Sequence, residues 1–164
     1  MRRRKPEPGA AAADQRTVQT AAYALLAGRD FSRHELTERL LRKGYGAAVV
    51  EAAVAAIVQE GFLREERFAE QFVTQRAGRG LGPLRVRMGL RDKGVEPETI
   101  EQALDTTETD WFQAAREARR RKFGLSPPAD YRERAKQARF LQYRGFSSDQ
   151  IRAALGPGDD DPDL

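Results

Sequence analysis

Arginine and lysine side chains are the groups in this sequence that are arranged for binding chemistry. Guanidinium and ammonium groups bind carboxylates and phosphates, and arginine does so with paired hydrogen bonds. The cations of interest are Arg39, Arg42 and Lys43; Arg85, Arg87, Arg91 and Lys93; Arg119, Arg120 and Arg121; and Arg139 and Arg144. We call this set the basic stripe. It predicts an anionic partner, either nucleic acid or an acidic protein groove.

Residue patterns typical of catalysis do not accompany these cations. The single histidine, His34, has no cysteine or second histidine beside it, so we expect no metal site. The glycines at 78, 80 and 82 resemble a phosphate loop, but the strand that such a loop follows is not indicated, so we interpret them as a turn. No serine, lysine or carboxylate pair forms a recognisable acid/base arrangement. We expect no enzyme activity, no catalytic residue and no cofactor.

The cations lie in a segment that occurs three times. Its copies are Leu40-x-x-Lys43-Gly44-Tyr45, Leu90-x-x-Lys93-Gly94-Val95 and Leu141-x-x-Arg144-Gly145-Phe146. Apolar residues recur six, nine and ten positions after each glycine, as Val50, Ala53 and Val54; Ile100, Ala103 and Leu104; and Ile151, Ala154 and Leu155. Such self-similarity predicts tandem repeats, which we place at residues 17–63, 64–105 and 106–155.

Each repeat is predicted to contain three helices. Ser32 with Glu35 and Ser147 with Gln150 form capping boxes, and Asp130 with Glu133 has the same spacing. Pro83 and Pro97 suit the first positions of two further helices. The helical spacing of Phe68, Phe72, Trp111, Phe112 and Phe146 favours core positions over stacking on nucleobases. We therefore expect an all-α fold of three tandem three-helix repeats, stacked into an elongated, curved molecule.

Charge and composition limit where the chain works and what it binds. The net charge is +4, but residues 106–155 alone carry +5 and the tail 156–164 carries −4. Residues 1–16 are a basic segment and 156–164 an acidic one, and both have the composition of disordered chain. The sequence has no cysteine and no apolar run of the roughly 18 residues that span a membrane. We expect a cytoplasmic protein.

The basic stripe falls mainly on the second helix of each repeat. Stacked repeats would align these helices along one side of the molecule. The third helices are unsuited to reading a DNA major groove, because residues 47–60 and 96–105 contain no lysine or arginine, and 147–155 contain only Arg152. The alternative is a solvated face of helix-favouring arginines, with pairs such as Glu35 and Arg39.

These motifs, in this order, resemble the RecX family of RecA regulators. The resemblance rests on Ala24-Leu25, Arg29-Asp30-Phe31-Ser32-Arg33-x-Glu35-Leu36, Leu40-x-x-Lys43-Gly44-Tyr45, Glu60-Gly61-Phe62-Leu63, Arg67-Phe68-Ala69, Gly80-x-Gly82-Pro83 and Leu90-x-x-Lys93-Gly94-Val95. It covers residues 20 to about 155. The third repeat matches more by the recurrence than by motif.

The resemblance implies a partner that the residues alone do not identify. It implies an elongated, curved monomer in the groove of the RecA–DNA filament, where it suppresses ATP hydrolysis, strand exchange and the stimulated self-cleavage of repressors. This would place the chain in DNA recombination, DNA repair and the SOS response. Some members also bind DNA directly, so contact with single- or double-stranded DNA is expected too. The alternative function is a DNA-binding tandem helical repeat protein that acts on nucleic acid directly.

Overall fold

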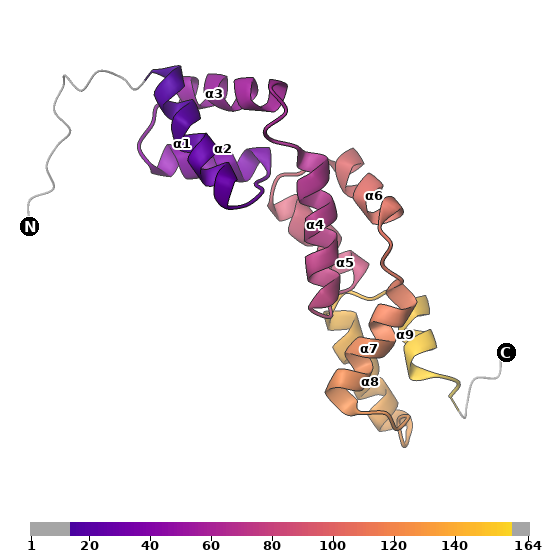
Figure 1. Ribbon diagram of the computed structural model, residues 1–164. Helices are drawn as coiled ribbons and strands as arrows, with labels where there is room; N and C mark the ends of the chain where they lie inside the picture. Colours follow the sequence, from indigo (N-terminus) through magenta and orange to yellow (C-terminus); the bar gives the residue numbers. More distant parts are fainter. Residues whose placement is uncertain (1–13, 159–164) are drawn as a thin grey trace, which may run out of the picture. The chain divides into compact units, whose positions relative to one another are not determined.

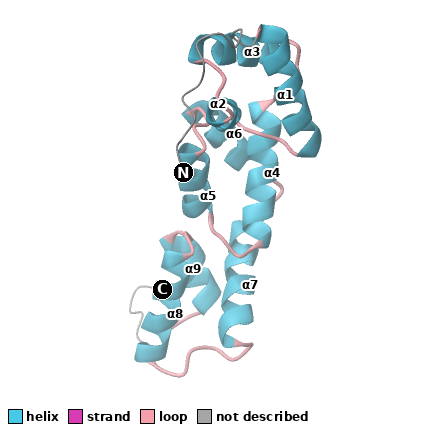
Figure 2. Cartoon of the chain, turned by 90° about the vertical axis from the view of Figure 1, so that its left-hand side faces the viewer, coloured by secondary structure: helices cyan, strands magenta, loops and turns pink. Residues whose placement is uncertain are grey.

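The computed structural model describes residues 14–158 as nine α-helices joined by loops, without a strand (Figures 1 and 2). The helices are α1 (Gln15–Gly28), α2 (Arg33–Arg42), α3 (Ala47–Gln59), α4 (Glu65–Gly78), α5 (Pro83–Asp92), α6 (Pro97–Thr106), α7 (Trp111–Phe123), α8 (Tyr131–Tyr143) and α9 (Ser148–Leu155). The predicted all-α class with three helices per repeat is confirmed. Of the two segments predicted to be disordered, residues 1–13 and 159–164 lie outside the described residues, whereas Asp14 caps α1 and the helix begins at Gln15, inside the segment 1–16.

The chain divides into two compact units, residues 1–65 and 66–164. The first unit holds α1, α2 and α3, and both α1 and α2 pack against α3. The second unit holds two groups of three helices, with α5 against α6 in one group and α7 and α8 against α9 in the other. Each group of three helices has its own hydrophobic core.

Side-chain caps begin the helices where the sequence predicted them. The Ser32 hydroxyl accepts a hydrogen bond from the backbone N–H of Glu35 at 3.1 Å, and the carboxylate of Asp130 accepts one from Glu133 at 2.8 Å. Ser147 forms a complete capping box with Gln150. Helices α5 and α6 begin at Pro83 and Pro97, where the missing N–H costs nothing. These caps fix the starts of the helices that carry the cations.

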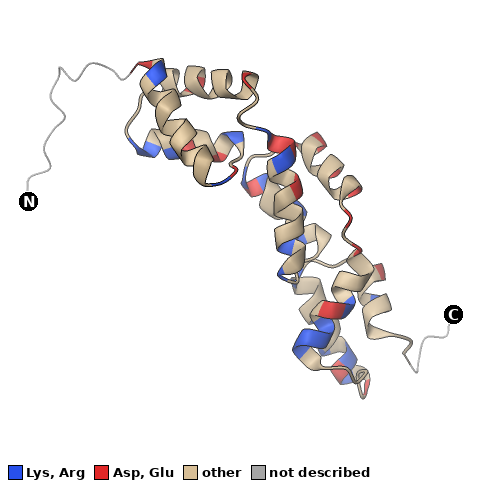
Figure 3. Cartoon of the chain, viewed as in Figure 1, with Lys and Arg blue, Asp and Glu red and all other residues tan. Residues whose placement is uncertain are grey.

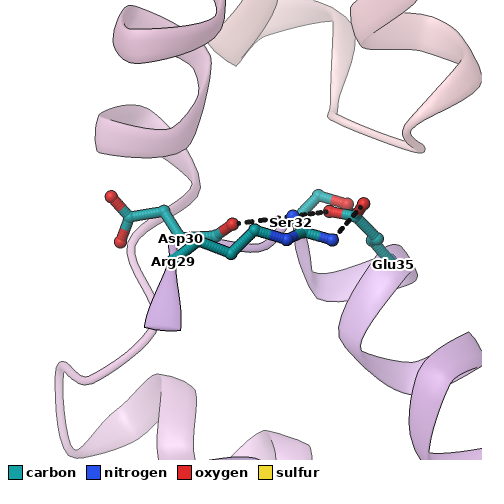
Figure 4. A network of polar contacts seen from close by, with 4 residues as sticks. All are labelled: Arg29, Asp30, Ser32 and Glu35. Carbon is teal, nitrogen blue, oxygen red and sulfur yellow. Dashed lines mark hydrogen bonds and ion pairs between the residues drawn. The ribbon is translucent and has the colours of Figure 1, made fainter. Parts of the chain in front are cut away.

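The loop before α2 is fixed by Arg29 (Figure 4). Its guanidinium donates to both carboxylate oxygens of Glu35, at 2.9 and 3.1 Å, and to the carbonyl oxygen of Asp30 at 3.0 Å. The same guanidinium lies 3.7 Å from the centre of the Phe31 ring, which is buried. The contacts tie the end of α1 to the first turn of α2.

The second helix of each repeat ends at a glycine with a left-handed backbone. Gly44, Gly94 and Gly145 have φ of 97°, 72° and 94°. In α5 and α8 the chain closes as a Schellman turn, in which the N–H of Val95 donates to the Leu90 carbonyl and that of Phe146 to the Leu141 carbonyl. The recurrence in the sequence therefore marks a repeated helix stop.

The three cores contain the apolar positions that recur after these glycines. Of those nine residues eight are buried, and Leu104 packs half-buried against its core. Phe68, Phe72 and Phe146 are buried as predicted, and Trp111 is half-buried. The prediction for Phe112 is wrong, because its side chain lies on the outer face of α7 and is 43% exposed. Its neighbour Trp111 takes the inward position instead.

Backbone groups join the two halves of the second unit. The N–H of Gly82 donates to the Arg144 carbonyl at 2.8 Å, and the N–H of Leu84 donates to the Gly145 carbonyl at 3.0 Å. The guanidinium of Arg85 donates to the Tyr143 carbonyl at 2.9 Å. We call these contacts the α5–α8 junction. It holds the start of α5 against the end of α8, and hence the second repeat against the third.

Candidate partner-binding surface

The first unit presents three cations of the basic stripe at the end of α2. Arg39, Arg42 and Lys43 are all exposed, while Leu36 and Leu40 of the same helix are fully buried. Positive charge in a last helical turn is stabilised by the helix dipole. These three side chains are therefore compatible with folding and available to an anionic partner.

Helix α5 holds four stripe residues in different environments. Arg91 is exposed, whereas Arg85, Arg87 and Lys93 are half-buried. Arg85 is part of the α5–α8 junction, and its guanidinium also lies 4.6 Å from the centre of the Tyr143 ring. Of the four, Arg91 is the one that the fold leaves fully presented to solvent.

Arg87 is held by Glu101 of α6. Its guanidinium donates to both carboxylate oxygens, at 2.7 and 3.1 Å. The hydrogen bond from Arg87 is the main cause that lowers the pKa of Glu101; burial opposes it, and the charges of Arg87 and Arg91 add to the lowering. The same hydrogen bond raises the pKa of Arg87. This pair links the second and third helices of the repeat, so Arg87 has a structural partner as well as a charge.

Arg119 differs from the rest of the basic stripe because it is buried. Only 5% of it is exposed, and its guanidinium donates to the side-chain oxygen of Gln137 at 3.0 Å and to the Ser126 carbonyl. Burying a charge is costly unless such hydrogen bonds satisfy it. Arg119 therefore ties α7 to α8 and to the loop between them, and we leave it out of the contact surface that we propose below.

The remaining stripe cations of the third repeat are accessible. Arg120, Arg121 and Arg139 are exposed. Arg144 is half-buried, with its guanidinium 5.2 Å from the centre of the Phe140 ring. Figure 3 shows basic residues along α7 and α8, whereas α6 carries only acidic charge and α3 only one acidic residue. Within the second unit, the cations of the basic stripe thus lie on or directly after α5, α7 and α8, and Arg152 of α9 is the one cation on a third helix.

One basic pocket escaped the sequence reasoning. It lies in the second unit, has a volume of about 170 Å³, and is lined by Arg79, Gly80, Ala118, Arg121, Lys122, Phe140 and Arg144. Arg79 and Lys122 are not stripe residues. No short motif could have identified the pocket, because it joins the end of α4 to α7 and α8, which lie some 40 to 65 positions further along the chain.

Residues 14–158 also lack a group of side chains that could hold a metal ion, since no cluster of three or more His, Asp or Glu side chains arranged for one occurs there. His34 is exposed in the first turn of α2. In the same part of the chain no helix has the length and apolar character needed to cross a membrane.

Known proteins match this chain over most of its length. Family models for the first, second and third three-helix domains of RecX match residues 20–55, 65–104 and 108–155. A relative named "Regulatory protein RecX" from Halorhodospira halophila is 45% identical over 92% of this chain and 94% of its own. Another of that name, from Pseudomonas savastanoi pv. phaseolicola, is 43% identical over 88% of this chain and 94% of its own.

Solved structures share the fold at lower sequence identity. The crystal structure of RecX from Lactobacillus salivarius has a TM-score of 0.70, with 21% identity, and the match covers 84% of this chain and 92% of that one. A second crystal structure, of a regulatory protein RecX, has a TM-score of 0.72 with 20% identity over 83% of this chain and 70% of that one. With three family domains matched in order and close relatives along nearly the whole chain, the protein belongs to the RecX family of regulatory proteins.

Proposed function

We propose that this chain regulates the RecA recombinase by binding in the groove of the RecA–DNA filament. The observation that carries the proposal is the match of all three helical domains to a family whose members are named regulatory proteins. As a bound regulator it would lower the ATP hydrolysis, strand exchange and coprotease activity of RecA. It would thereby act in DNA recombination, DNA repair and the SOS response, as a cytoplasmic monomer.

The contact surface that we propose consists of the accessible basic stripe. Its fully exposed members are Arg39, Arg42, Lys43, Arg91, Arg120, Arg121 and Arg139, and its half-buried members are Arg85, Arg87, Lys93 and Arg144. Each unit presents several of these cations, and several cations on one unit attract an anionic groove more strongly than a single surface charge does, which also speeds encounter. The regulator then acts by occupying the groove, which requires no chemistry of its own.

A second function is direct binding to DNA. It is favoured by the charge of +5 on residues 106–155 and by the exposed arginines of α7 and α8. The affinity of a protein that binds through phosphate contacts falls steeply as salt increases. If RecA is the target, RecA–DNA filaments should bind the protein far better than bare DNA at the same salt concentration. Equal affinity for both would favour the second function.

The test is the DNA-dependent ATPase activity of RecA. The wild-type protein should lower it at substoichiometric amounts, and adding bare DNA in excess should not restore it. The variant Arg42→Glu/Arg91→Glu/Arg139→Glu should lose this inhibition, since each reversal removes an attraction and adds a repulsion. It should still fold, because an exposed charge contributes under about 1 kcal/mol.

A matched control separates the basic stripe from net charge. The variant Arg16→Glu/Arg64→Glu/Arg132→Glu makes the same change in charge at exposed arginines outside the stripe, and it should inhibit nearly as well as the wild type. If the control loses inhibition and the stripe variant retains it, the contact surface has been placed on the wrong residues. If the wild-type protein leaves the ATPase unchanged, regulation of RecA itself is wrong.

A further inference from the structure

The pocket between α4, α7 and α8 has the charge of an anion site. Four cations line it: Arg79 after the end of α4, Arg121 and Lys122 in the last turn of α7, and Arg144 after α8. No aspartate or glutamate is among the lining residues. The other lining residues are small or apolar, so nothing in the wall offsets the positive charge.

The four cations also lack carboxylate partners elsewhere in residues 14–158, where none of them forms an ion pair. Two of them form cation–π contacts with an aromatic ring instead. The Arg144 guanidinium and the Lys122 ammonium lie 5.2 and 5.9 Å from the centre of the Phe140 ring. A ring attracts a cation without neutralising it. The fold thus gathers positive charge here and leaves it unpaired.

Small residues keep the pocket open. Gly80 and Ala118 form part of its wall, and a Cβ atom placed on Gly80 would lie 3.9 Å from the Cβ of Ala118. The volume of about 170 Å³ is below the roughly 300–1,000 Å³ of clefts that hold drug-sized ligands. The pocket is therefore large enough for a small anionic group, and too small for a whole nucleoside or a peptide of several residues.

We propose that this pocket binds a backbone phosphate of a single nucleic-acid strand. Guanidinium forks match the oxygens of a phosphate. The two charged oxygens of a backbone phosphate point outward from a tetrahedral centre, so donors can approach them from more directions than they can approach a planar carboxylate, which suits a pocket with three arginines and a lysine. A strand also brings further phosphates to the exposed cations nearby, such as Arg139 on α8.

This site shares Arg121 and Arg144 with the contact surface proposed above and rests on the second proposed function, direct binding to DNA, so it is tested without RecA. Arg79 and Lys122 line the pocket but are not part of the basic stripe, so replacing them tests the pocket alone. The control is Arg16→Gln/Arg64→Gln, which removes the same charge from exposed arginines of the first unit, outside the pocket and outside α7 and α8. Circular dichroism verifies that both variants keep the wild-type helical content.

The first measurement is fluorescence anisotropy with a labelled oligothymidine of about 16 nucleotides. This length is the upper end of the site sizes that single-strand-binding domains cover. The variant Arg79→Gln/Lys122→Gln should bind about tenfold more weakly at low salt, and its plot of log K against log salt should be shallower by about 0.7, the loss of one phosphate contact. The control should keep the wild-type slope. Equal losses in both variants would mean diffuse attraction, and the pocket assignment would be wrong.

The second measurement locates the bound anion and identifies its source. In amide NMR spectra the oligothymidine should shift the Gly80 resonance of the wild type and not that of the Arg79→Gln/Lys122→Gln variant. Polyglutamate at equal charge should not displace the oligothymidine from the pocket. Displacement by polyglutamate would instead indicate a site for an acidic protein. A Gly80 shift with inorganic phosphate but none with the oligothymidine would refute binding of a strand.

Discussion

Replacing Gly82 by alanine should weaken the link between the second and third repeats. A Cβ atom on Gly82 would lie 2.5 Å from the carbonyl carbon of Gly145 and 2.6 Å from the backbone nitrogen of Phe146. Both atoms belong to the backbone of the α8 end, so no side chain can rotate away to make room. The start of α5 must move, and the two backbone hydrogen bonds of the α5–α8 junction must lengthen or break.

The cost follows from these contacts. Overpacking in a tightly packed region costs about 1–3 kcal/mol, and two lost hydrogen bonds at about 1 kcal/mol each raise the expected destabilisation to about 3–5 kcal/mol. Domains of this size have unfolding free energies of about 5–15 kcal/mol, so the effect is a large share of the total. With a urea m-value of about 1–3 kcal/mol/M, the unfolding midpoint should fall by at least about 1 M.

The assay uses the single tryptophan of the chain. Trp111 opens α7 of the third repeat but packs against the core of the second, so its fluorescence reports on the contact between them. In Gly82→Ala the fluorescence transition should occur at lower urea than in the wild type. Gly78→Ala is the control, since a Cβ there meets nothing within 4 Å, and alanine in a helix is favoured by about 0.5–1 kcal/mol. If Gly82→Ala unfolds at the wild-type midpoint, the α5–α8 junction does not couple the repeats.

Three further substitutions or conditions test single contacts. Arg119→Met should destabilise the third repeat by about 2–4 kcal/mol in thermal unfolding, because it leaves the Gln137 oxygen and a backbone carbonyl without their donor; an unchanged melting temperature would contradict this role. Ser147→Ala should cost about 1 kcal/mol by removing the capping box of α9, whereas Ser147→Thr should retain most of it. Because the Arg87 hydrogen bond lowers the folded-state pKa of Glu101, this pair stabilises the fold above the pKa of Glu101 in the unfolded chain, and that contribution is lost as pH falls through the folded-state value. The pair is partly exposed, so Glu101→Gln should remove under about 1 kcal/mol at neutral pH and should abolish this acid dependence in denaturation curves.

The helices and their ends were predictable because the signals for them are local. A serine or aspartate cap, a proline at the first position and a glycine stop each act within one turn, and the threefold recurrence repeats the information. Ser147, Pro83 and Gly94 therefore lie where the sequence placed them. The apolar positions follow from helical period in the same way. The prediction for Phe112 was wrong because two adjacent aromatic residues of a helix cannot both face one core. The helical period of the apolar residues did not decide which of Trp111 and Phe112 faces inward.

Whether each cation is exposed or held by a hydrogen bond was less predictable, because this depends on residues far along the chain. The sequence placed Arg119 in the basic stripe with its exposed neighbours Arg120 and Arg121. In the structure its guanidinium is buried and donates to Gln137 on another helix. Arg85 donates a hydrogen bond to the carbonyl of Tyr143, which is 58 positions away in the sequence, and no local pattern predicts such a contact. The distribution of lysine and arginine in the sequence thus identified the helices rich in cations. Contacts between helices decide which of these cations remain exposed to a partner.

The α5–α8 junction also bears on how this sequence can change over time. Its two backbone pairs involve Gly82, Leu84, Arg144 and Gly145 through main-chain atoms, so side chains at 84 and 144 can vary without removing them. The neighbouring repeat excludes a side chain at both glycines, because a Cβ atom on Gly145 would lie 2.6 Å from the backbone nitrogen of Arg85, but Gly145 has a second constraint. Gly145 needs its left-handed φ of 94° to end α8, and would need it in an isolated repeat. Gly82 has an ordinary extended backbone, with φ of −88°, and is excluded from carrying a side chain only by the neighbouring repeat. The restriction at position 82 is therefore a property of the joined repeats, and a second repeat separated from the third would be free to lose that glycine.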